Sequence, residues 1–450
     1  MRHRYNLSFR REQQKKERIK RIIIIVIVLF VFAAIGTLIY FAYNNIDWGA
    51  LRAPSSDKNT AENRDNSDKE KPKTVELTIN SVGEVTLYNN QLSAAQTDDG
   101  YDFNDSFKNV KEYIEDGDLS LFDLETTFGG EPYSGYPKFN SPDELADALK
   151  DAGFDVAVTA NEHALDSDAE GVKRTIETLD DAGLKAAGTK AEADDKDYLM
   201  TTVNDVKVGI VAYTEETSYN ADNRTLDGNK MEDDEAELIN SYSPRVDKDM
   251  DKVKKSIDDA KEEGAQVIIC YFHWGDDYDT TPNETEKEIA ESLADMGADM
   301  IFATHPHVVQ EIDSIKTDEG KEVPVFYSLG NFLSSQRYET VGNRRVEQGM
   351  IAQVKLKIDT SSGEITNIEY GYIPTWIDRY WNNDLNANLY TVLPLVGDLE
   401  SNPVIEESDH LTEAERALED LTELLGEPIK TADDKESDNT SGGAADERDN

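Results

Sequence analysis

The chain contains one long uninterrupted apolar run, followed much later by short apolar runs that alternate with amphipathic segments. The long run occupies residues 22–43 (IIIIVIVLFVFAAIGTLIYFAY). As a helix it would be about 33 Å long at about 1.5 Å per residue, enough to cross a hydrocarbon core of about 30 Å. A cleaved signal peptide is the alternative, but its apolar region is typically about 7–15 residues and ends at small residues. The pattern therefore predicts an uncleaved transmembrane helix.

The shorter runs predict strands that alternate with amphipathic helices. Early strand–helix–strand units followed by antiparallel strands indicate an α/β domain with mixed sheets. Ser141 is the expected N-cap of the first helix, and Gly183 is the expected C-cap of the second. The expected helices are 141–153, 168–183, 247–263, 284–297 and one within 395–425. The expected strands are 75–83, 118–125, 154–160, 266–272, 299–305, 323–329, 349–359 and 364–374, with a hairpin over 201–213 that turns at Asn204–Asp205.

Polar segments divide the chain into parts. Residues 1–21 form a basic arm, 44–73 a flexible stalk and 427–450 a disordered acidic tail. Between the last two lie the main domain, 74–380, and a C-terminal extension with a helix, 381–426. Because basic residues stay on the cytoplasmic side, we expect a single-pass protein of the cell membrane with its N-terminus cytoplasmic and its C-terminal domain extracellular.

Composition excludes several classes of protein. Asp and Glu number 93 against 46 Lys and Arg, a formal net charge of −47, which argues against a nucleic-acid partner because phosphate binding needs a basic surface. Apolar residues make up 38% of the chain, too few for a polytopic membrane protein. Cys270 is the single cysteine, so an intrachain disulfide and a cysteine-based zinc site are both excluded.

Carboxylates and histidines follow the ends of several predicted strands. Open α/β sheets bind ligands at the edge formed by the carboxyl ends of their strands. Carboxylate oxygens and imidazole nitrogens are typical ligands of Mn, Fe and Zn. Each group alone has an ordinary explanation as a turn, a cap, a loop histidine or core packing. Their repeated occurrence in order favours a metal site. The groups are Gly83–Glu84, Asp123–Glu125, Asn161–His163, His273–Asp277 and His305–His307.

At these residues the chain resembles the CapA (PgsA) capsule-synthesis family of poly-γ-glutamate production. The resemblance extends from Glu76 to Ile377. It implies a four-layer αββα sandwich, similar to the calcineurin-like metallophosphoesterases, behind the N-terminal transmembrane helix. The motifs that carry it are VGEVTL (82–87), FDLETTF (122–128), TANEHALD (159–166), FHWGDDY (272–278), GADMIFATHPHVVQ (297–310) and VFYSLGNFL (325–333).

The resemblance also implies roles for individual residues. His163 would assist at the leaving or attacking oxygen, with Asn161 beside it, and Glu125, Asp277 and Asn331 would line the cleft. The implied cofactor is a divalent metal (Mn, Fe, Zn or Mg), present as two ions. Its implied ligands are Glu84, Asp123, Glu162, His273, His305 and His307.

Four positions depart from the family pattern. Glu84 stands for Asp, Asp123 for Asn, Glu162 for Asn, and Asp277 for Glu. The first three substitutions keep an oxygen ligand but change its reach or charge. The longer, charged arm of Glu162 would either tighten binding of a hard cation or spoil phosphoesterase geometry.

Three functions are compatible with these features. The first is an anchored accessory subunit of poly-γ-glutamate synthesis or export, with that or another anionic polymer and the membrane subunits of a capsule synthetase as partners. The second is an extracytoplasmic metal-dependent hydrolase of a phosphoester or γ-glutamyl polymer, and the third is a non-catalytic polymer-binding scaffold. An acidic body would repel polyglutamate unless a metal centre supplies positive charge. Basic residues near the motifs would either help to attract an anionic polymer or serve only as ordinary surface charges. They are Lys138, Arg337, Arg344 and Arg345.

Overall fold

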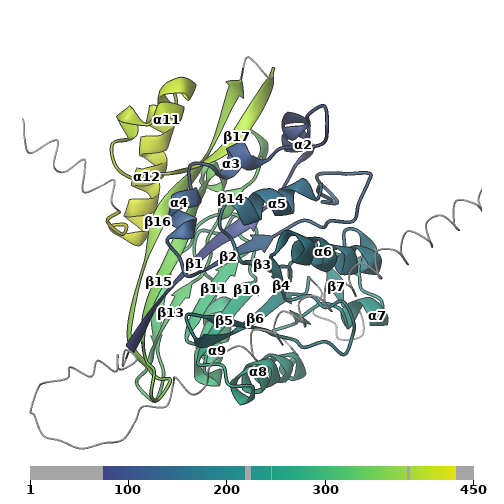
Figure 1. Ribbon diagram of the computed structural model, residues 1–450, viewed down its shortest axis with the longest axis vertical. Helices are drawn as coiled ribbons and strands as arrows, with labels where there is room; N and C mark the ends of the chain where they lie inside the picture. Colours follow the sequence, from purple (N-terminus) through teal and green to yellow (C-terminus); the bar gives the residue numbers. More distant parts are fainter. Residues whose placement is uncertain (1–73, 218–223, 245, 383–385, 432–450) are drawn as a thin grey trace, which may run out of the picture. The chain divides into compact units, whose positions relative to one another are not determined.

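The computed structural model describes residues 74–217, 224–244, 246–382 and 386–431 (Figure 1). Within these residues no helix is both long and apolar enough to cross a bilayer. The predicted transmembrane run at 22–43 lies outside the described residues, as do the basic arm, the stalk and tail residues 432–450.

The first sheet combines a parallel half with an antiparallel half. Its order is β17-β16-β15-β1-β2-β3-β4, and β14 pairs with the end of β1. Strands β1 to β4 run parallel, whereas β15, β16 and β17 are antiparallel neighbours. The bounds are β1 Thr74–Val85, β2 Leu119–Leu124, β3 Val156–Val158, β4 Lys185–Ala187, β14 Asn331–Leu333, β15 Gln348–Asp359, β16 Ile365–Asn382 and β17 Ala387–Pro394.

The second sheet has the order β12-β13-β11-β10-β6-β5, with β9 paired to β6. The predicted hairpin over 201–213 is confirmed, because β5 and β6 are antiparallel and Asn204 and Asp205 have φ of 51° and 66°. The bounds are β5 Leu199–Val203, β6 Val206–Glu215, β9 Ser241–Tyr242, β10 Val267–His273, β11 Met300–Thr304, β12 Ile312–Lys316 and β13 Glu322–Phe326. A separate two-stranded ribbon joins β7 Thr225–Leu226 to β8 Asn229–Lys230.

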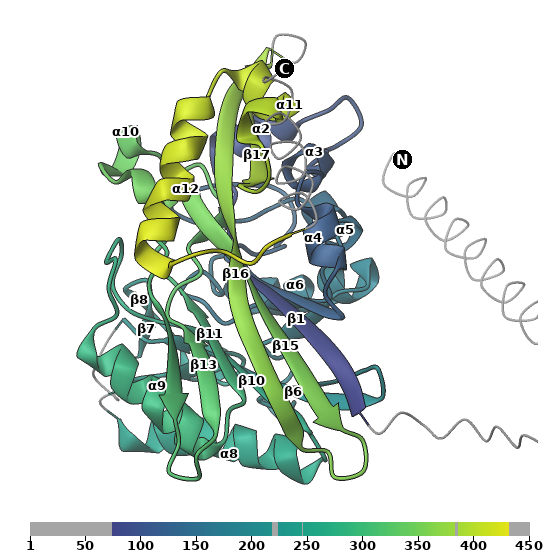
Figure 2. The same cartoon turned by 90° about the vertical axis from the view of Figure 1, so that its left-hand side faces the viewer.

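The two sheets pack face to face, with helices on their outer sides (Figures 1 and 2). Ile79 and Leu121 of the first sheet meet Ile269 and Phe302 of the second in a shared core. Helices α5 and α6 cover the outer face of the first sheet, and α8 and α9 cover that of the second. This is the αββα arrangement expected from the sequence. The helix bounds are α2 Asn89–Ala95, α3 Asn104–Phe107, α4 Lys111–Glu115, α5 Glu144–Asp151, α6 Asp168–Ala182, α7 Asp233–Ala236, α8 Asp247–Glu262, α9 Glu284–Met296, α10 Tyr338–Val341, α11 Pro403–Ser408 and α12 Leu411–Leu425.

Local details depart from the predicted boundaries at two places. Helix α5 begins at Glu144, so Ser141 is not its N-cap; the Ser141 hydroxyl instead lies 2.9 Å from that of Thr126. Strand β16 continues to Asn382, and β17 adds an edge strand that hydrophobic periodicity did not indicate. Gly183 does end α6, with φ of 82°, as predicted.

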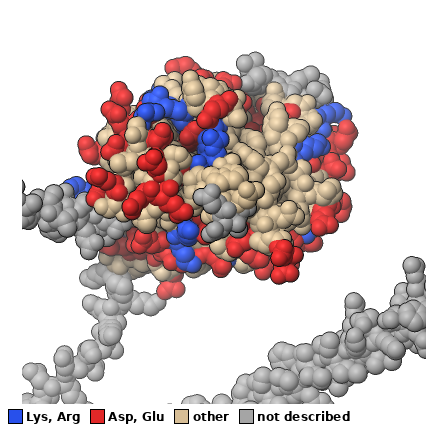
Figure 3. All heavy atoms as spheres, turned by 90° about the horizontal axis from the view of Figure 1, so that it is seen from above, with Lys and Arg blue, Asp and Glu red and all other residues tan. Residues whose placement is uncertain are grey.

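The helix expected within 395–425 is α12, which packs against β16. Tyr372 of β16 donates its hydroxyl to the Gly426 carbonyl at 2.6 Å, just after the helix ends. The face of the molecule seen in Figure 3 carries more acidic than basic side chains, in agreement with the net charge.

Candidate metal centre

The carboxyl ends of strands from both sheets meet, and the predicted ligands lie there. Glu84 of β1 is the register partner of Asp123 on β2 and of Asn331 on β14. His273 is the last residue of β10, and His305 follows the end of β11 directly. Residues that are up to 247 positions apart in the sequence therefore converge, because parallel strands end at the same edge of each sheet and the two sheets pack face to face.

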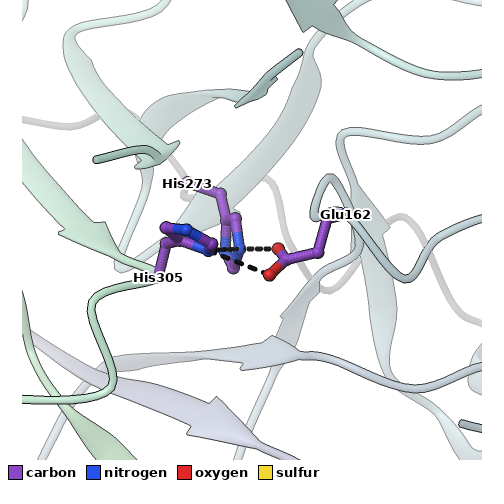
Figure 4. Close-up of side chains that lie close together, drawn as sticks. All are labelled: Glu162, His273 and His305. Atoms are coloured by element: carbon purple, nitrogen blue, oxygen red, sulfur yellow. Dashed lines mark hydrogen bonds and ion pairs between the residues drawn. The ribbon is translucent and has the colours of Figure 1, made fainter. Parts of the chain in front are cut away.

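One cluster consists of Glu162, His273 and His305 (Figure 4). Glu162 Oε1 lies 2.9 Å from His305 Nδ1, and its other oxygen contacts His273 Nε2. The two imidazole nitrogens are 3.1 Å apart. Burial would raise the pKa of Glu162, but His273 and His305 hold it well below its usual range. Three ligand atoms thus face one point, from the loop after β3 and from two strand ends.

Asp123 fixes the orientation of His273. Its Oδ2 lies 2.9 Å from His273 Nδ1, so Nε2 is the nitrogen that faces Glu162. The other oxygen accepts a hydrogen bond from Asn161 Nδ2 at 2.9 Å. Asn161 also donates to the Leu124 carbonyl and is fully buried. Carboxylates that hold the second nitrogen of a histidine set its tautomer in many metal sites.

A second cluster is formed by Glu84, His307 and Asn331. Glu84 Oε1 accepts a hydrogen bond from the His305 backbone at 2.7 Å and lies 3.8 Å from His307 Nδ1. Asn331 donates its amide to Gln336 and to the Val346 carbonyl. Three buried side-chain atoms of this second cluster have no hydrogen-bond partner within the described residues: Glu84 Oε2, His307 Nδ1 and Asn331 Oδ1.

These unpartnered atoms fit a metal ion. Buried polar atoms in folded proteins nearly always have partners, so several orphans at one place require an explanation. All three can be electron-pair donors, and burial lowers the pKa of His307, which favours the neutral imidazole that metals bind. The residues present at both clusters therefore suit divalent cations.

His163 is held beside the clusters as a separate group. Its Nδ1 lies 2.9 Å from Asp166 Oδ2, and its Nε2 is 3.9 Å from Glu125 Oε1. Burial lowers the pKa of His163, but the hydrogen bond to Asp166 and the negative charges of Glu162, Asp166 and Asp227 together raise it overall. Glu125 accepts a hydrogen bond from Thr86 at 2.6 Å, and burial raises its pKa well above the usual range, as does nearby Glu162. In both groups the pKa is shifted toward the protonated form.

The His305–Pro306–His307 segment has an unusual backbone. His305 and His307 have φ of 110° and 58°, a region that side chains other than glycine rarely adopt. Such conformations cost about 1–3 kcal/mol each and concentrate at functional sites. The ring centroids are 6.1 Å apart, and the two histidines join different clusters, His305 the first and His307 the second.

A cavity of about 850 Å³ opens above the clusters. Of the residues expected to line a cleft, Glu125 and Asp277 do so, whereas Asn331 is buried beneath the lining. The basic residues near the motifs are elsewhere: Arg337 is buried under the Tyr390 ring, and Arg344 pairs with Asp420.

Sequence reasoning missed several cavity residues. Gln336 Nε2 donates to the hydroxyl of Tyr88 at 3.2 Å and lies 3.5 Å from that of Tyr278, while its Oε1 accepts from Asn331. Asp166, which orients His163, follows it by three residues within the TANEHALD motif. That spacing was a usable signal, but nothing local to Gln336 or Tyr88 indicated a role.

Comparison with known proteins identifies the relatives of this chain. Residues 78–336 match the family "Bacterial capsule synthesis protein PGA_cap". The chain is 28% identical over 288 residues to the "Capsule biosynthesis protein CapA" of Bacillus anthracis, covering 62% of this chain and 64% of that protein. It is 28% identical over 230 residues to the "PGA biosynthesis protein CapA" of Bacillus subtilis (strain 168), covering 50% and 53%. The match thus spans less than two thirds of the length of either relative.

Solved structures show only distant likeness. A "novel phosphatase" of Mycoplasma pneumoniae aligns with a TM-score of 0.39 and 15% identity, over 67% of this chain and 94% of that one. A hypothetical protein of Thermus thermophilus also aligns with a TM-score of 0.39 and 15% identity, over 66% and 99%. These likenesses are too distant to assign an activity.

Proposed function

The chain belongs to the bacterial capsule synthesis protein family PGA_cap, and on this premise we propose that it acts in capsule polymer synthesis or export through a cleft that binds divalent metal ions. The matched range, 78–336, contains every candidate ligand from Glu84 to Asn331. The relatives whose names mention capsule or PGA biosynthesis support the polymer as the object of this activity.

The observation that carries the proposal is the set of orphaned donor atoms next to a complete ligand cluster. Glu162, His273 and His305 would hold one ion, and Glu84, His307 and Asn331 would hold a second, while Asp123 would orient His273 through its Nδ1. Mixed carboxylate and imidazole donors favour Mn, Fe or Zn over Mg, which prefers oxygen ligands alone.

The proposed reaction is hydrolysis of a phosphoester or of a γ-glutamyl bond. Two divalent ions would supply an activated water and would neutralise charge on the oxygens bound to the phosphorus or carbonyl carbon that the water attacks. His163 is placed to donate a proton to the leaving group, because Asp166 holds its Nδ1 and leaves Nε2 on the cavity side. Asp123 keeps His273 in one tautomer, and the buried walls exclude bulk water from the floor of the cleft.

The location of the domain is part of the proposal. We propose that residues 22–43 anchor the protein and that the basic arm before them stays in the cytoplasm, which leaves the acidic body outside. Amide ligation that needs ATP would take place on the other side of the membrane. The domain would therefore act on the polymer as it emerges, beside the membrane subunits of a synthetase.

Metal content with turnover tests the proposal. The full chain in detergent would be compared with the His305→Ala/His307→Ala double variant, and with His410→Ala as a matched histidine control on α12's side of the protein. Near-stoichiometric Mn, Fe or Zn that the double variant loses, together with Mn-dependent turnover of bis-p-nitrophenyl phosphate or poly-γ-glutamate, would support a hydrolase. No bound metal and no turnover in the wild type would reject it and leave a non-catalytic polymer-binding scaffold.

A further inference from the structure

The lining of the cavity is acidic and contains no lysine or arginine among the described residues. Four glutamates and three aspartates contribute to it. One of the glutamates, Glu216, is neutralised from behind by an ion pair with Arg224, which does not itself line the cavity. Of the other carboxyl groups, Glu125 is buried and accepts the hydrogen bond from Thr86, and Asp277 lies 3.6 Å from His305 Nε2.

These carboxyl groups divide into a floor and a mouth. Glu162 lies on the floor with the histidines, where only 11% of its side chain is exposed. Asp227, Asp276 and Asp277 are exposed and stand at the mouth. His307 also lines the cavity; it is 9% exposed, and its Nδ1 has no hydrogen-bond partner among the described residues. This unpartnered atom indicates that the floor binds a ligand, whatever the mouth binds. Metal ions on the floor would be balanced there by Glu84, Asp123 and Glu162, whereas the mouth would keep its negative charge.

One wall of the cavity is aromatic from the mouth to the floor. Tyr136 is 66% exposed, and its ring centroid is 6.3 Å from that of Phe139. Phe139 in turn meets Tyr88 at 5.1 Å and His163 at 4.7 Å, both edge to face. Tyr278 also lines the cavity, and its hydroxyl lies 3.5 Å from Gln336 Nε2, which donates to the Tyr88 hydroxyl at 3.2 Å.

We propose that the mouth of the cleft binds an ammonium group of the substrate while the bond to be cleaved lies over the floor. Aromatic faces next to carboxylates are the usual surroundings of bound ammonium groups, because ring quadrupoles and negative charges both attract a cation. The interior of a polycarboxylate chain has the opposite charge and is disfavoured at this mouth. This inference rests on the proposed function and specifies the substrate of the same cleft.

Applied to a γ-glutamyl polymer, the inference fixes the direction of entry. Every internal residue of such a chain carries a carboxylate, and its only ammonium group is at the amino terminus. The amino-terminal end would therefore enter the cleft, with its ammonium between Tyr136 and the mouth aspartates. A neutral ligand such as a saccharide would also stack on aromatic rings, but it would show no dependence on the aspartate charges.

Binding of matched oligomers tests the inference without requiring turnover. Calorimetry on the full chain in detergent would compare a γ-linked glutamate pentamer that has a free amino terminus with the same pentamer after N-acetylation, without added metal and with Mn. We expect the free amine to bind about tenfold more tightly at low salt and the preference to weaken as salt screens the exposed aspartates.

Two variants separate the charge from the fold. Asp227→Asn/Asp276→Asn removes two mouth charges, and asparagine tolerates the φ of 44° at position 227. Asp318→Asn/Glu319→Gln is the matched control, because both residues are exposed in the turn between β12 and β13. The first variant should reduce the preference to about twofold or less, and the control should leave it unchanged.

The outcomes distinguish this inference from the proposed function. Equal affinity for the two pentamers, tighter binding of the acetylated one, or no binding of either would overturn the inference. A tenfold preference that the control keeps and the mouth variant loses would support it, even if neither pentamer is cleaved. In that case the proposed hydrolysis would fail while the recognition of the ammonium group stands. If both pentamers were cleaved at equal rates and bound with equal affinities, the proposed hydrolysis would stand while the recognition of the ammonium group would fail.

Discussion

Asp123 Oδ2 lies 2.9 Å from His273 Nδ1 across the interface between the two sheets, and this contact decides which nitrogen of His273 faces the metal cluster. Asp123 ends β2 of the first sheet, and His273 ends β10 of the second. Burial raises the pKa of Asp123, although His273 opposes that shift. The ligand geometry therefore depends on the packing of one sheet against the other.

The first prediction concerns this contact. Asp123→Ala should weaken metal binding about 10- to 100-fold, because outer partners of ligating histidines typically contribute that much. His273→Ala should weaken it further, since it removes a donor atom. Titration of the metal-stripped protein with Mn or Zn measures both, and circular dichroism checks that each variant is folded. Unchanged affinity in Asp123→Ala would show that the contact is only structural.

A second prediction separates the two clusters. Glu162→Gln should remove about one metal ion per chain, and Glu84→Gln should remove the other, because each carboxylate belongs to a different ligand set. Elemental analysis of the purified variants gives the stoichiometry directly. If either variant alone loses both ions, or if neither loses any, two separable sites are not present.

The third prediction tests the proton donor. His163→Asn should slow hydrolysis of an alkyl phosphodiester about 10²- to 10⁴-fold, but should affect a p-nitrophenyl ester much less. The reason is that p-nitrophenolate is a good leaving group without protonation, whereas an alkoxide must receive a proton as it leaves. Steady-state rates on the two esters provide the comparison, and Asp166→Asn should show a smaller effect in the same direction. Equal losses on both esters would argue against proton donation by His163.

Stability should depend on pH through Glu286. Burial raises the pKa of Glu286 from 4.5 to about 7, and Glu215, Asp276 and Asp279 add to this effect. The Glu286 carboxyl therefore binds its proton more tightly in the folded state than in the unfolded state. The contribution of Glu286 to the free energy of unfolding is complete below about pH 4.5 and is lost as the pH rises through about 7. Glu286→Gln should remove this dependence while keeping the capping contact with Asn283.

Thermal unfolding at pH 5 and pH 8 measures that effect. The Tm of Glu286→Gln relative to wild type should be higher at pH 8 than at pH 5, because wild type then bears the cost of a buried charge. A difference in Tm that is the same at both pH values would show that Glu286 does not titrate in this interval.

The sequence was most informative where chemistry and strand ends coincide. Glu84, His273 and His305 each lie at or next to the end of a buried strand, so the rule that parallel strands share an edge placed each of them at the carboxyl edge of its own sheet, and the packing of the two sheets brings these edges together. The alternation of apolar runs and amphipathic helices indicated an α/β domain with mixed sheets, whereas the four-layer sandwich was expected only from the family resemblance.

The aromatic wall could not be predicted in the same way. Tyr136 and Phe139 belong to the loop between β2 and α5, whose path depends on contacts such as the one between the Phe139 backbone and Asp166. Strand β17 was missed for a related reason, since its first half is half-exposed and only its second half is apolar. Tertiary packing rather than local periodicity sets both features.

The last prediction concerns a close backbone approach beneath the second cluster. A Cβ added at Gly83 would lie 1.8 Å from the carbonyl oxygen of Gly330, far inside contact distance, and that oxygen cannot swing away as a flexible side chain would. The same carbonyl accepts a hydrogen bond from the backbone of Glu84 at 3.3 Å. Gly83→Ala should therefore push β1 away from β14, displace Glu84 from Asn331, and lower both the Tm and the affinity of the second metal ion. Gly320→Ala is the control for backbone strain without a contact, because Gly320 lies in a turn with open space around it and has a φ of 85°. If Gly83→Ala kept wild-type metal stoichiometry and Tm, the junction between β1 and β14 would not be what holds Glu84 in place.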